Sequence, residues 1–442
     1  MNDDSTLFGK DAFVASSSRP GANRSQPARL RVPDRMQAIL DPACIDERLP
    51  GDHEVRTVWA VVERMDLSAI SDQIEARGSS PGRAATDPRL LVALMLFAAI
   101  EGIGSCREIA ERCERDLPYQ WLCGGVSLNH HTLSDFRVGY EKELDDLLTR
   151  MIATLVHQGL VQVQRISQDG VRVRASAGRS SFRRGETLAK LAVEARRHVE
   201  DLKKQADDPA LPARQKAARE RAANDRLVRI ERALELLPAA QATKARHTGK
   251  PSKDQPPRVS TTDPEAHRMK VGTGAILPAY NIQLASDPVS RAVVGVIVGN
   301  HGADGQFSVP MRQQVEQKSK GKITEHLIDG GYFNKNALEQ AHENGVVVYM
   351  PLPQATEGQS DPAEKKPGDG PGTVAWRARM TQEAAKLIYK KRASTSETIN
   401  ADLTTHRALG RLMVRGITKV KCIVLWNVLA YNLMHFGTSL LS

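Results

Sequence analysis

The stretch ITEHLIDGGYFNKNAL, residues 323–338, contains an apolar segment that ends in a single acidic residue, Asp329. The pattern predicts a strand, a short turn at the two glycines and then a helix near Asn336–Glu343. In open α/β sheets, ligands gather outside the carboxyl ends of strands, where a catalytic acid is expected. Asp-Gly-Gly also fits a simple turn, because Asp tolerates turn conformations and Gly adopts positive φ. The stretch alone favours neither interpretation.

Apolar segments around this stretch predict further strands. They are AYNIQLASD at 279–287, AVVGVIVGN at 292–300 and VVVYMP at 346–351, with a helix expected at Ser308–Gln317. Alternating apolar strands and helices are typical of a parallel sheet that is covered by helices. We therefore expect an α/β core in the second half of the chain.

A second acidic residue, Asp169, lies in VQVQRISQDGVRVRA, residues 161–175, where the apolar period changes to two. Asp-Gly between alternating segments is a strong signal for a two-residue hairpin turn. If the strand instead runs through, Asp169 shares a face with Val171 and Val173 and becomes partly buried. A buried carboxylate without a partner is costly, so that arrangement would favour a bound metal ion.

A third candidate, Glu397, lies in IYKKRASTSETINADL, residues 388–403. Ser394 and Glu397 fit a capping box at a helix start. Alternatively, a helix runs through from about Ala384, with Glu397 on its surface. Together the three acids fit phosphodiester chemistry with two Mg²⁺ or Mn²⁺ ions, roughly 3.5 to 4 Å apart, because such sites need a small cluster of oxygen ligands.

Composition points to a polyanionic partner. The 442 residues carry a formal net charge of +10, and length alone predicts two or three domains. The longest uncharged run, residues 90–100, is shorter than the ~20 residues that a membrane span needs, so we expect a buried helix and no membrane partner. The start MNDDST has no export signal, which predicts a cytoplasmic protein. Five dispersed cysteines without a C-x-x-C pair disfavour a disulfide framework and a zinc site.

The chain divides into segments of different composition. Residues 1–30 resemble a flexible tail, and 31–160 are helical, with helix starts predicted at Ser105 and Thr132. The layout there suits both a helix-turn-helix DNA reader and a plain helical bundle. Residues 161–182 and 262–442 form the expected core, with a Pro/Gly linker at 353–373. Residues 183–261 predict an inserted hairpin of two charged helices, either a DNA-gripping or dimerising arm or simply a solvated pair.

The ordered set of motifs resembles a bacterial insertion-sequence transposase of the DDE class, a superfamily with a ribonuclease-H-like core and a Y-x-x-R...E signature. The similarity extends from about Val32 to Phe436. It rests on YQWLCGG and HHTLSDFR in the first half, and then on QDGVRVRASAG, DPEAHRMK, PAYNIQLASD, LIDGGYFN, IYKKRASTSETIN and VRGITKVKCIVLWNVLAYNL. The resemblance implies an α/β fold with a ribonuclease-H-like mixed sheet flanked by helices, an all-α N-terminal domain and the inserted helical hairpin.

The resemblance also assigns roles to residues. Asp169 on the central strand, Asp329 after a neighbouring strand and Glu397 on a following helix are the implied catalytic metal ligands. Tyr389 and Arg392 are implied to contact DNA near the scissile phosphate. Further basic candidates for DNA contacts are Arg174, Lys270 and Arg137.

One departure from the family pattern affects Arg392 and Glu397. Four residues separate them here, whereas the commoner signature has three. On a regular helix a five-residue step turns about 140°, against about 40° for four residues, so the two side chains would face apart. A helix break at Ser394 or a π-bulge would restore the geometry. The usual basic residue seven positions beyond the Glu is Thr404, and Arg407 is a possible substitute.

The sequence therefore predicts a transposase that binds the terminal inverted repeats of its mobile element as a homodimer or higher oligomer. It would cut DNA and join a freed 3′-hydroxyl to target DNA with two divalent ions. The alternatives are a metal-dependent nuclease on the same core and a catalytically inactive DNA-binding protein.

Overall fold

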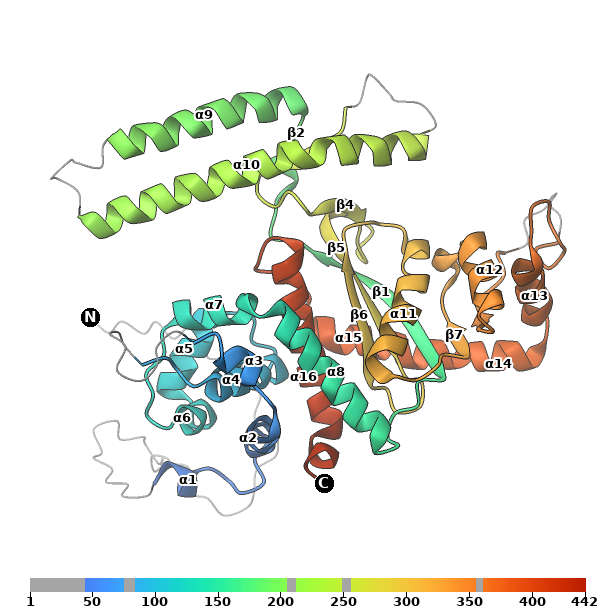
Figure 1. The fold of residues 1–442 in the computed structure, drawn as a ribbon, viewed down its shortest axis with the longest axis horizontal. Coiled ribbons are helices and arrows are strands. Elements are labelled where there is room, and N and C mark those ends of the chain that lie inside the picture. Colours follow the sequence, from blue (N-terminus) through green and yellow to red (C-terminus); the bar gives the residue numbers. More distant parts are fainter. Residues whose placement is uncertain (1–43, 75–83, 205–211, 249–255, 355–360) are drawn as a thin grey trace, which may run out of the picture. The chain divides into compact units, whose positions relative to one another are not determined.

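A computed structural model describes residues 44–74, 84–204, 212–248, 256–354 and 361–442 (Figure 1). The predicted tail at 1–30 and part of the linker at 353–373 lie outside these ranges. The first half is helical, as predicted. Its helices are α1 (Ile45–Arg48), α2 (Glu54–Arg64), α3 (Ser68–Ser71), α4 (Pro88–Ile100), α5 (Cys106–Arg115), α6 (Leu117–Cys123), α7 (His130–Gly139) and α8 (Glu141–His157).

The long apolar run forms α4, which is buried along nearly its whole length. Among the described residues, no helix is both long enough and apolar enough to cross a membrane. The Ser105 hydroxyl accepts a hydrogen bond from the Glu108 amide and begins α5, as predicted. The second predicted start is displaced: Asn129 caps α7, because its side chain accepts from two amides of the first turn.

The core contains a mixed six-stranded sheet. Its strands are β1 (Arg165–Arg174), β4 (His267–Lys270), β5 (Ile276–Ser286), β6 (Val293–Gly299), β7 (Glu325–Leu327) and β8 (Val347–Tyr349). The strand order is β4-β5-β1-β7-β8, with β6 also paired to β5. β1 is antiparallel to β5 and parallel to β7, and β7 is parallel to β8. The strand β1 begins four residues later than its apolar alternation, which starts at Val161.

The Asp-Gly pair in β1 is not a hairpin turn, because the strand runs through it in register with β5. Gly170 lies opposite Gln283, and a Cβ at this position would be 2.2 Å from the Gln283 side-chain nitrogen. Glycine is required here by close packing. The hairpin interpretation of this segment is therefore wrong, and Asp169 is a strand residue.

Helices surround the sheet and complete the C-terminal half. They are α11 (Ser308–Ser319), α12 (Lys335–Glu343), α13 (Pro371–Met380), α14 (Glu383–Arg392), α15 (Thr398–Ala401) and α16 (Ile417–Leu441), with 3-10 turns η1 (Arg179–Ser181), η3 (Asp304–Gln306) and η4 (Gly330–Tyr332) and π-helical segments η5 (Ala393–Glu397) and η6 (Asp402–His406). The helix α16 packs against α4, α8 and β6. It thus joins the N-terminal helices to the sheet.

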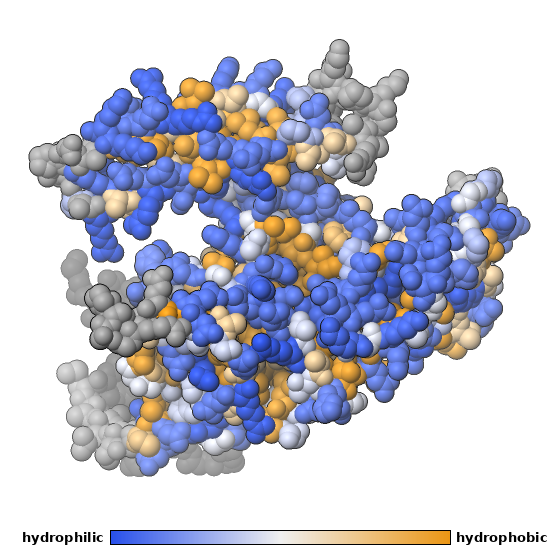
Figure 2. Space-filling model, viewed as in Figure 1, coloured by the Kyte–Doolittle hydropathy of each residue, from blue (hydrophilic) through white to orange (hydrophobic). Residues whose placement is uncertain are grey.

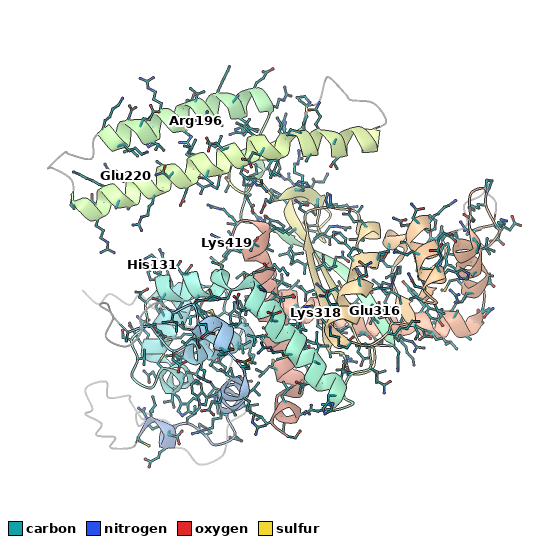
Figure 3. The ribbon with its side chains drawn as sticks, in the orientation of Figure 1. His131, Arg196, Glu220, Glu316, Lys318 and Lys419 are labelled. Carbon is teal, nitrogen blue, oxygen red and sulfur yellow. The ribbon has the colours of Figure 1, made fainter. Side chains whose placement is uncertain are left out.

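Two polar contacts reinforce this junction. The Asn432 side chain of α16 pairs with both backbone groups of Val293 in β6, at 2.9 Å each. Lys318, labelled in Figure 3, donates from α11 to the Asp145 carboxylate of α8 at 2.5 Å. Lys318 is almost fully buried, so removal of the Asp145 carboxylate would leave a buried charge without its partner and would be costly.

A helical pair, which we call the arm, comprises α9 (Gly185–Lys204) and α10 (Ala213–Thr248). It lies between two short paired strands, β2 (Phe182–Arg183) and β3 (Val259–Ser260). The helix α10 extends beyond its predicted end at Leu237 and contains Pro238. Two small apolar clusters hold the arm together, and they centre on Leu188, Ala192, Ala195, Ile230, Ala233 and Val259. Figure 2 shows apolar residues along the arm flanked by hydrophilic ones.

Candidate active site

Asp169 and Asp329 meet at the guanidinium group of Arg392. The Arg392 Nη2 atom lies 2.8 Å from Asp169 Oδ1 and 3.7 Å from Asp329 Oδ2. The exposed fractions of the three side chains are 8% for Arg392, 16% for Asp169 and 41% for Asp329. Two carboxylates that are 160 positions apart in the sequence therefore share one cation at the edge of a buried sheet.

Strand direction explains this convergence. Because β1 and β7 are parallel, the chain leaves β7 near the part of β1 that carries Asp169. Asp329 follows β7 and begins the turn η4, where its Oδ1 accepts a hydrogen bond from the Gly331 amide at 2.7 Å. The turn interpretation of Asp329 is confirmed, because one oxygen caps the turn, while its other oxygen faces Arg392.

The helix after α14 contains a π-helical segment, η5, between Arg392 and Glu397. The capping-box interpretation of Ser394 and Glu397 is wrong, because the helical backbone continues through both residues. Ser396 is pinned to β1, with its hydroxyl 2.6 Å from the Ser167 hydroxyl. The π-helix expected at this spacing is present, yet it turns Arg392 and Ser396 towards β1.

Glu397 points elsewhere. Its side chain is exposed and makes no hydrogen bond or ion pair with any described residue. One turn further on, the Asn400 side-chain nitrogen donates to Asp169 Oδ2 at 3.0 Å. The Asn400 oxygen is buried without a partner. Asn400, which the sequence patterns did not single out, thus contacts the first aspartate directly.

The site has a distinct electrostatic character. Burial raises the pKa of Asp169 above its ordinary value, and Arg392 only partly opposes this effect. Burial likewise raises the pKa of Tyr389. Its phenol also interacts electrostatically with Arg392 and both aspartates. The structure therefore brings four of the predicted residues together: Asp169, Asp329, Tyr389 and Arg392.

Asp304 is a further acidic residue that the sequence patterns missed. Its Oδ1 accepts from the side chains of Asn281 at 2.7 Å and Gln283 at 2.9 Å, and its Oδ2 accepts from Arg172 at 2.8 Å. A Cβ on Gly331 would lie 3.6 Å from Asp304 Oδ2 and 3.0 Å from Asp329 Oδ1, so this carboxylate lies near the second aspartate. Asp304 follows β6 as Asp329 follows β7. The position of an acidic residue shortly after an apolar strand could therefore have identified Asp304 from the sequence.

The oxygen donors at this site are of the kind that Mg²⁺ and Mn²⁺ prefer. Asp169 and Asp329 already surround one positive charge, and the unpartnered Asn400 oxygen lies beside them. Among the described residues, no group of three or more His, Cys, Asp or Glu side chains is arranged to hold a metal ion. The Arg392 guanidinium lies against both aspartates in this structure, and Glu397 does not reach them.

The remaining basic candidates lie apart from this site. Arg174 and Lys270 are exposed at the ends of β1 and β4. Arg137 of α7 is partly buried and donates to the Gly104 carbonyl at 2.5 Å. Its guanidinium group is therefore engaged inside the helical domain.

Two family models match the chain. One is described as "Transposase domain (DUF772)" and matches residues 43–139, which contain α1–α7. The other is described as "Transposase DDE domain" and matches residues 373–436. The two matches support an insertion-sequence transposase of the DDE class. No match was found among curated proteins.

The DDE-domain match contains Tyr389, Arg392 and Glu397, together with the π-helical segments. Neither match reaches Asp169 or Asp329. For these two aspartates, the structural argument is their convergence on Arg392.

Proposed function

We propose that this chain binds the terminal inverted repeats of its mobile element and catalyses metal-dependent DNA strand cleavage and strand transfer. The observation that carries the proposal is the meeting of Asp169 and Asp329 at Arg392, on the helix that the DDE-domain match contains. Transposition requires that phosphodiester chemistry and DNA contact occur in one place. The paired carboxylates suit the phosphodiester chemistry, and the neighbouring Tyr389 and Arg392 on α14 suit DNA contact.

We further propose that the core is ribonuclease-H-like. In the family that the sequence resembles, the first Asp lies on the central strand, the second just after a neighbouring strand and the Glu on a following helix. Here Asp169 lies in β1 at the middle of the strand order, Asp329 follows β7, and Glu397 ends η5. This arrangement supports the assignment of Asp169 and Asp329 as catalytic residues, and it places Glu397 on the expected helix.

Two Mg²⁺ or Mn²⁺ ions would supply activation of the attacking oxygen and stabilisation of the leaving oxygen. Asp169 and Asp329 would hold them, with the Asn400 oxygen beside Asp169. Glu397 would join this set after rotation towards the sheet. Arg392 would then leave the carboxylates and contact a DNA phosphate, for which its planar guanidinium is suited. Tyr389 would line the same DNA path, and synapsis of two ends would require at least a dimer.

Incubation of the purified protein with element-end duplex and Mg²⁺ or Mn²⁺ tests the proposal. Cleavage with strand joining is expected. Cleavage alone would instead indicate a nuclease, and tight metal-independent binding without chemistry would indicate a DNA-binding protein. The variant Asp329→Ala should lower the rate of both reactions at least about 100-fold, because it removes a proposed ligand, while DNA affinity stays nearly unchanged.

Asp52→Ala is the matched control, since Asp52 is exposed near the start of α2 and far from the sheet in the fold. It should cleave and join at the parental rate. If Asp329→Ala retained parental activity, the assignment of Asp329 as a catalytic residue would be wrong.

A further inference from the structure

A hollow of about 640 Å³ lies at the base of the arm, where residues of β2, α10, β3 and β4 face one another. In Figure 1, β4 lies below the right-hand half of α10. Three arginines line the hollow: Arg184 after β2, Arg258 before β3 and Arg268 on β4. Among the described residues that line it, none is Asp or Glu. We call this feature the arm hollow.

The three arginines are free to bind a ligand. All are exposed, and none of their guanidinium groups donates a hydrogen bond or forms an ion pair with a described residue. Two arginines of the arm differ in this respect, since Arg196 pairs with Glu231 and Arg232 pairs with Glu235. Three like charges around one hollow repel one another, and a bound anion would offset that repulsion.

We propose that the arm hollow binds backbone phosphates of double-stranded DNA. The identity of this occupant rests on the function proposed above, whereas the anion-binding character rests on the three arginines. Guanidinium groups bind phosphate oxygens through two parallel hydrogen bonds, and contacts from separate elements can follow successive phosphates of one strand. Such contacts fix the position of the duplex and carry no sequence information.

The register of the sheet links the arm hollow to the catalytic aspartates. Arg268 lies opposite Pro278 of β5, and Asp169 lies opposite Leu284 of the same strand. Pro278 and Leu284 are an even number of residues apart, so Arg268 and Asp169 belong to the same face of the sheet. Six residues of strand span roughly 20 Å, which corresponds to about six base pairs of duplex. A duplex held in the arm hollow can therefore extend to the active site.

The test measures DNA affinity of the full chain by fluorescence anisotropy in EDTA across a series of salt concentrations. The probe is a labelled mixed-sequence duplex. For the combined variant Arg184→Ala, Arg258→Ala and Arg268→Ala, the slope of log affinity against log salt should become shallower by roughly 2 to 3. Each lost phosphate contact removes about 0.9 from that slope.

A matched control removes three exposed cations of α9 that lie outside the arm hollow: Arg197→Ala, Lys203→Ala and Lys204→Ala. This control should keep a slope within about one unit of the parent. If both variants changed the slope equally, general charge rather than the arm hollow would bind DNA, and the proposal would be overturned. It would also be overturned if the triple arginine variant bound DNA like the parent. If that variant bound DNA normally but lost self-association in light scattering, the occupant of the arm hollow would be a second copy of the chain.

Because the measurement contains no metal, it separates this inference from the proposed chemistry. If the parental protein binds DNA through the arm hollow but never cuts it, the proposed function is wrong and the DNA-binding role of the arm hollow still stands. Where cleavage is observed, methylphosphonate substitution about six base pairs from the cut should weaken binding of the parent. The same substitution should leave the affinity of the triple arginine variant unchanged.

Discussion

The sheet that carries Asp169 and the arm formed by α9 and α10 use their residues in opposite ways. The sheet, the N-terminal helices and α16 share one continuous apolar core. The arm holds two clusters of three buried residues each and exposes its charged side chains. Figure 3 shows Arg196 and Glu220 on the arm among many other charged side chains. Catalytic carboxylates need a fixed geometry, which a deep core provides, whereas contact with a polyanion needs accessible cations.

The largest expected effect on stability comes from truncating a buried isoleucine in each of these two regions. Ile282 of β5 and Ile230 of α10 are both fully buried. Ile282→Ala should lower the free energy of global unfolding by about 2–5 kcal/mol, because the dense core cannot collapse around the missing atoms. Ile230→Ala should loosen the arm alone, because its cluster is small and separate.

Hydrogen exchange read by mass spectrometry distinguishes the two outcomes. Ile230→Ala should speed exchange in α9 and α10 while β1 and β5 keep parental protection. Equal loss of protection in the sheet would show that the arm and the core unfold as one unit, and the contrast between the regions would fail.

A smaller effect depends on pH and concerns a buried ion pair of the core region. Burial acts to raise the pKa of Asp369, but hydrogen bonds from Lys335, the Lys366 amide and Arg377 outweigh it and lower this pKa to about 2. The unfolded carboxyl has its ordinary pKa of 3.8. The unfolded state therefore binds more protons between these values, so this stabilisation is complete above pH 4 and is lost as the pH falls to about 2.

Urea unfolding at a series of pH values checks this prediction. Asp369→Asn has no carboxyl group to protonate at this position, so its free energy of unfolding should fall less than that of the parent between pH 4 and about pH 2. The difference in stability between parent and variant should therefore shrink as the pH falls. A difference that stays constant down to pH 2 would contradict the assigned role of Asp369.

The smallest effect is expected on the arm surface. Arg196 and Glu231 form an ion pair at 2.7 Å, with exposed side-chain fractions of 55% and 36%. Exposed pairs contribute between about 0.2 and 1 kcal/mol, since water screens them. Arg196→Ala should therefore change the unfolding free energy by less than about 1 kcal/mol. A double-mutant cycle with Glu231→Ala measures the pair directly, and a coupling well above this range would show that the arm depends on its surface charges.

Much of the fold could be predicted because its signals are local. The apolar run of α4, the strands β5 and β6, and the paired charged helices each follow from composition over one segment. The course of the chain at Asp169 could not be predicted this way. Asp-Gly fits a turn locally, and only Gln283 across the sheet shows that Gly170 lies within a strand.

In the candidate site, too, local sequence patterns identified some residues, and others are evident only from tertiary contacts. Strand patterns singled out Asp169 and Asp329, the family resemblance added Tyr389 and Arg392, and the structure places these four together. Asp304 and Asn400 were missed because their importance depends on neighbours far away in the sequence. The spacing between Arg392 and Glu397 correctly suggested an irregular helix, although it did not predict that Ser396 would face the sheet.

The sequence by itself determined which segments are strands and helices, where acidic residues follow apolar strands, and that the chain is rich in cations. These features depend on side-chain type and periodicity, which each segment carries alone. Only the tertiary structure decided that two distant aspartates share Arg392, that Glu397 is exposed, and that three unpaired arginines surround one hollow. Such contacts depend on strand direction, register and burial, which are properties of the whole packed chain.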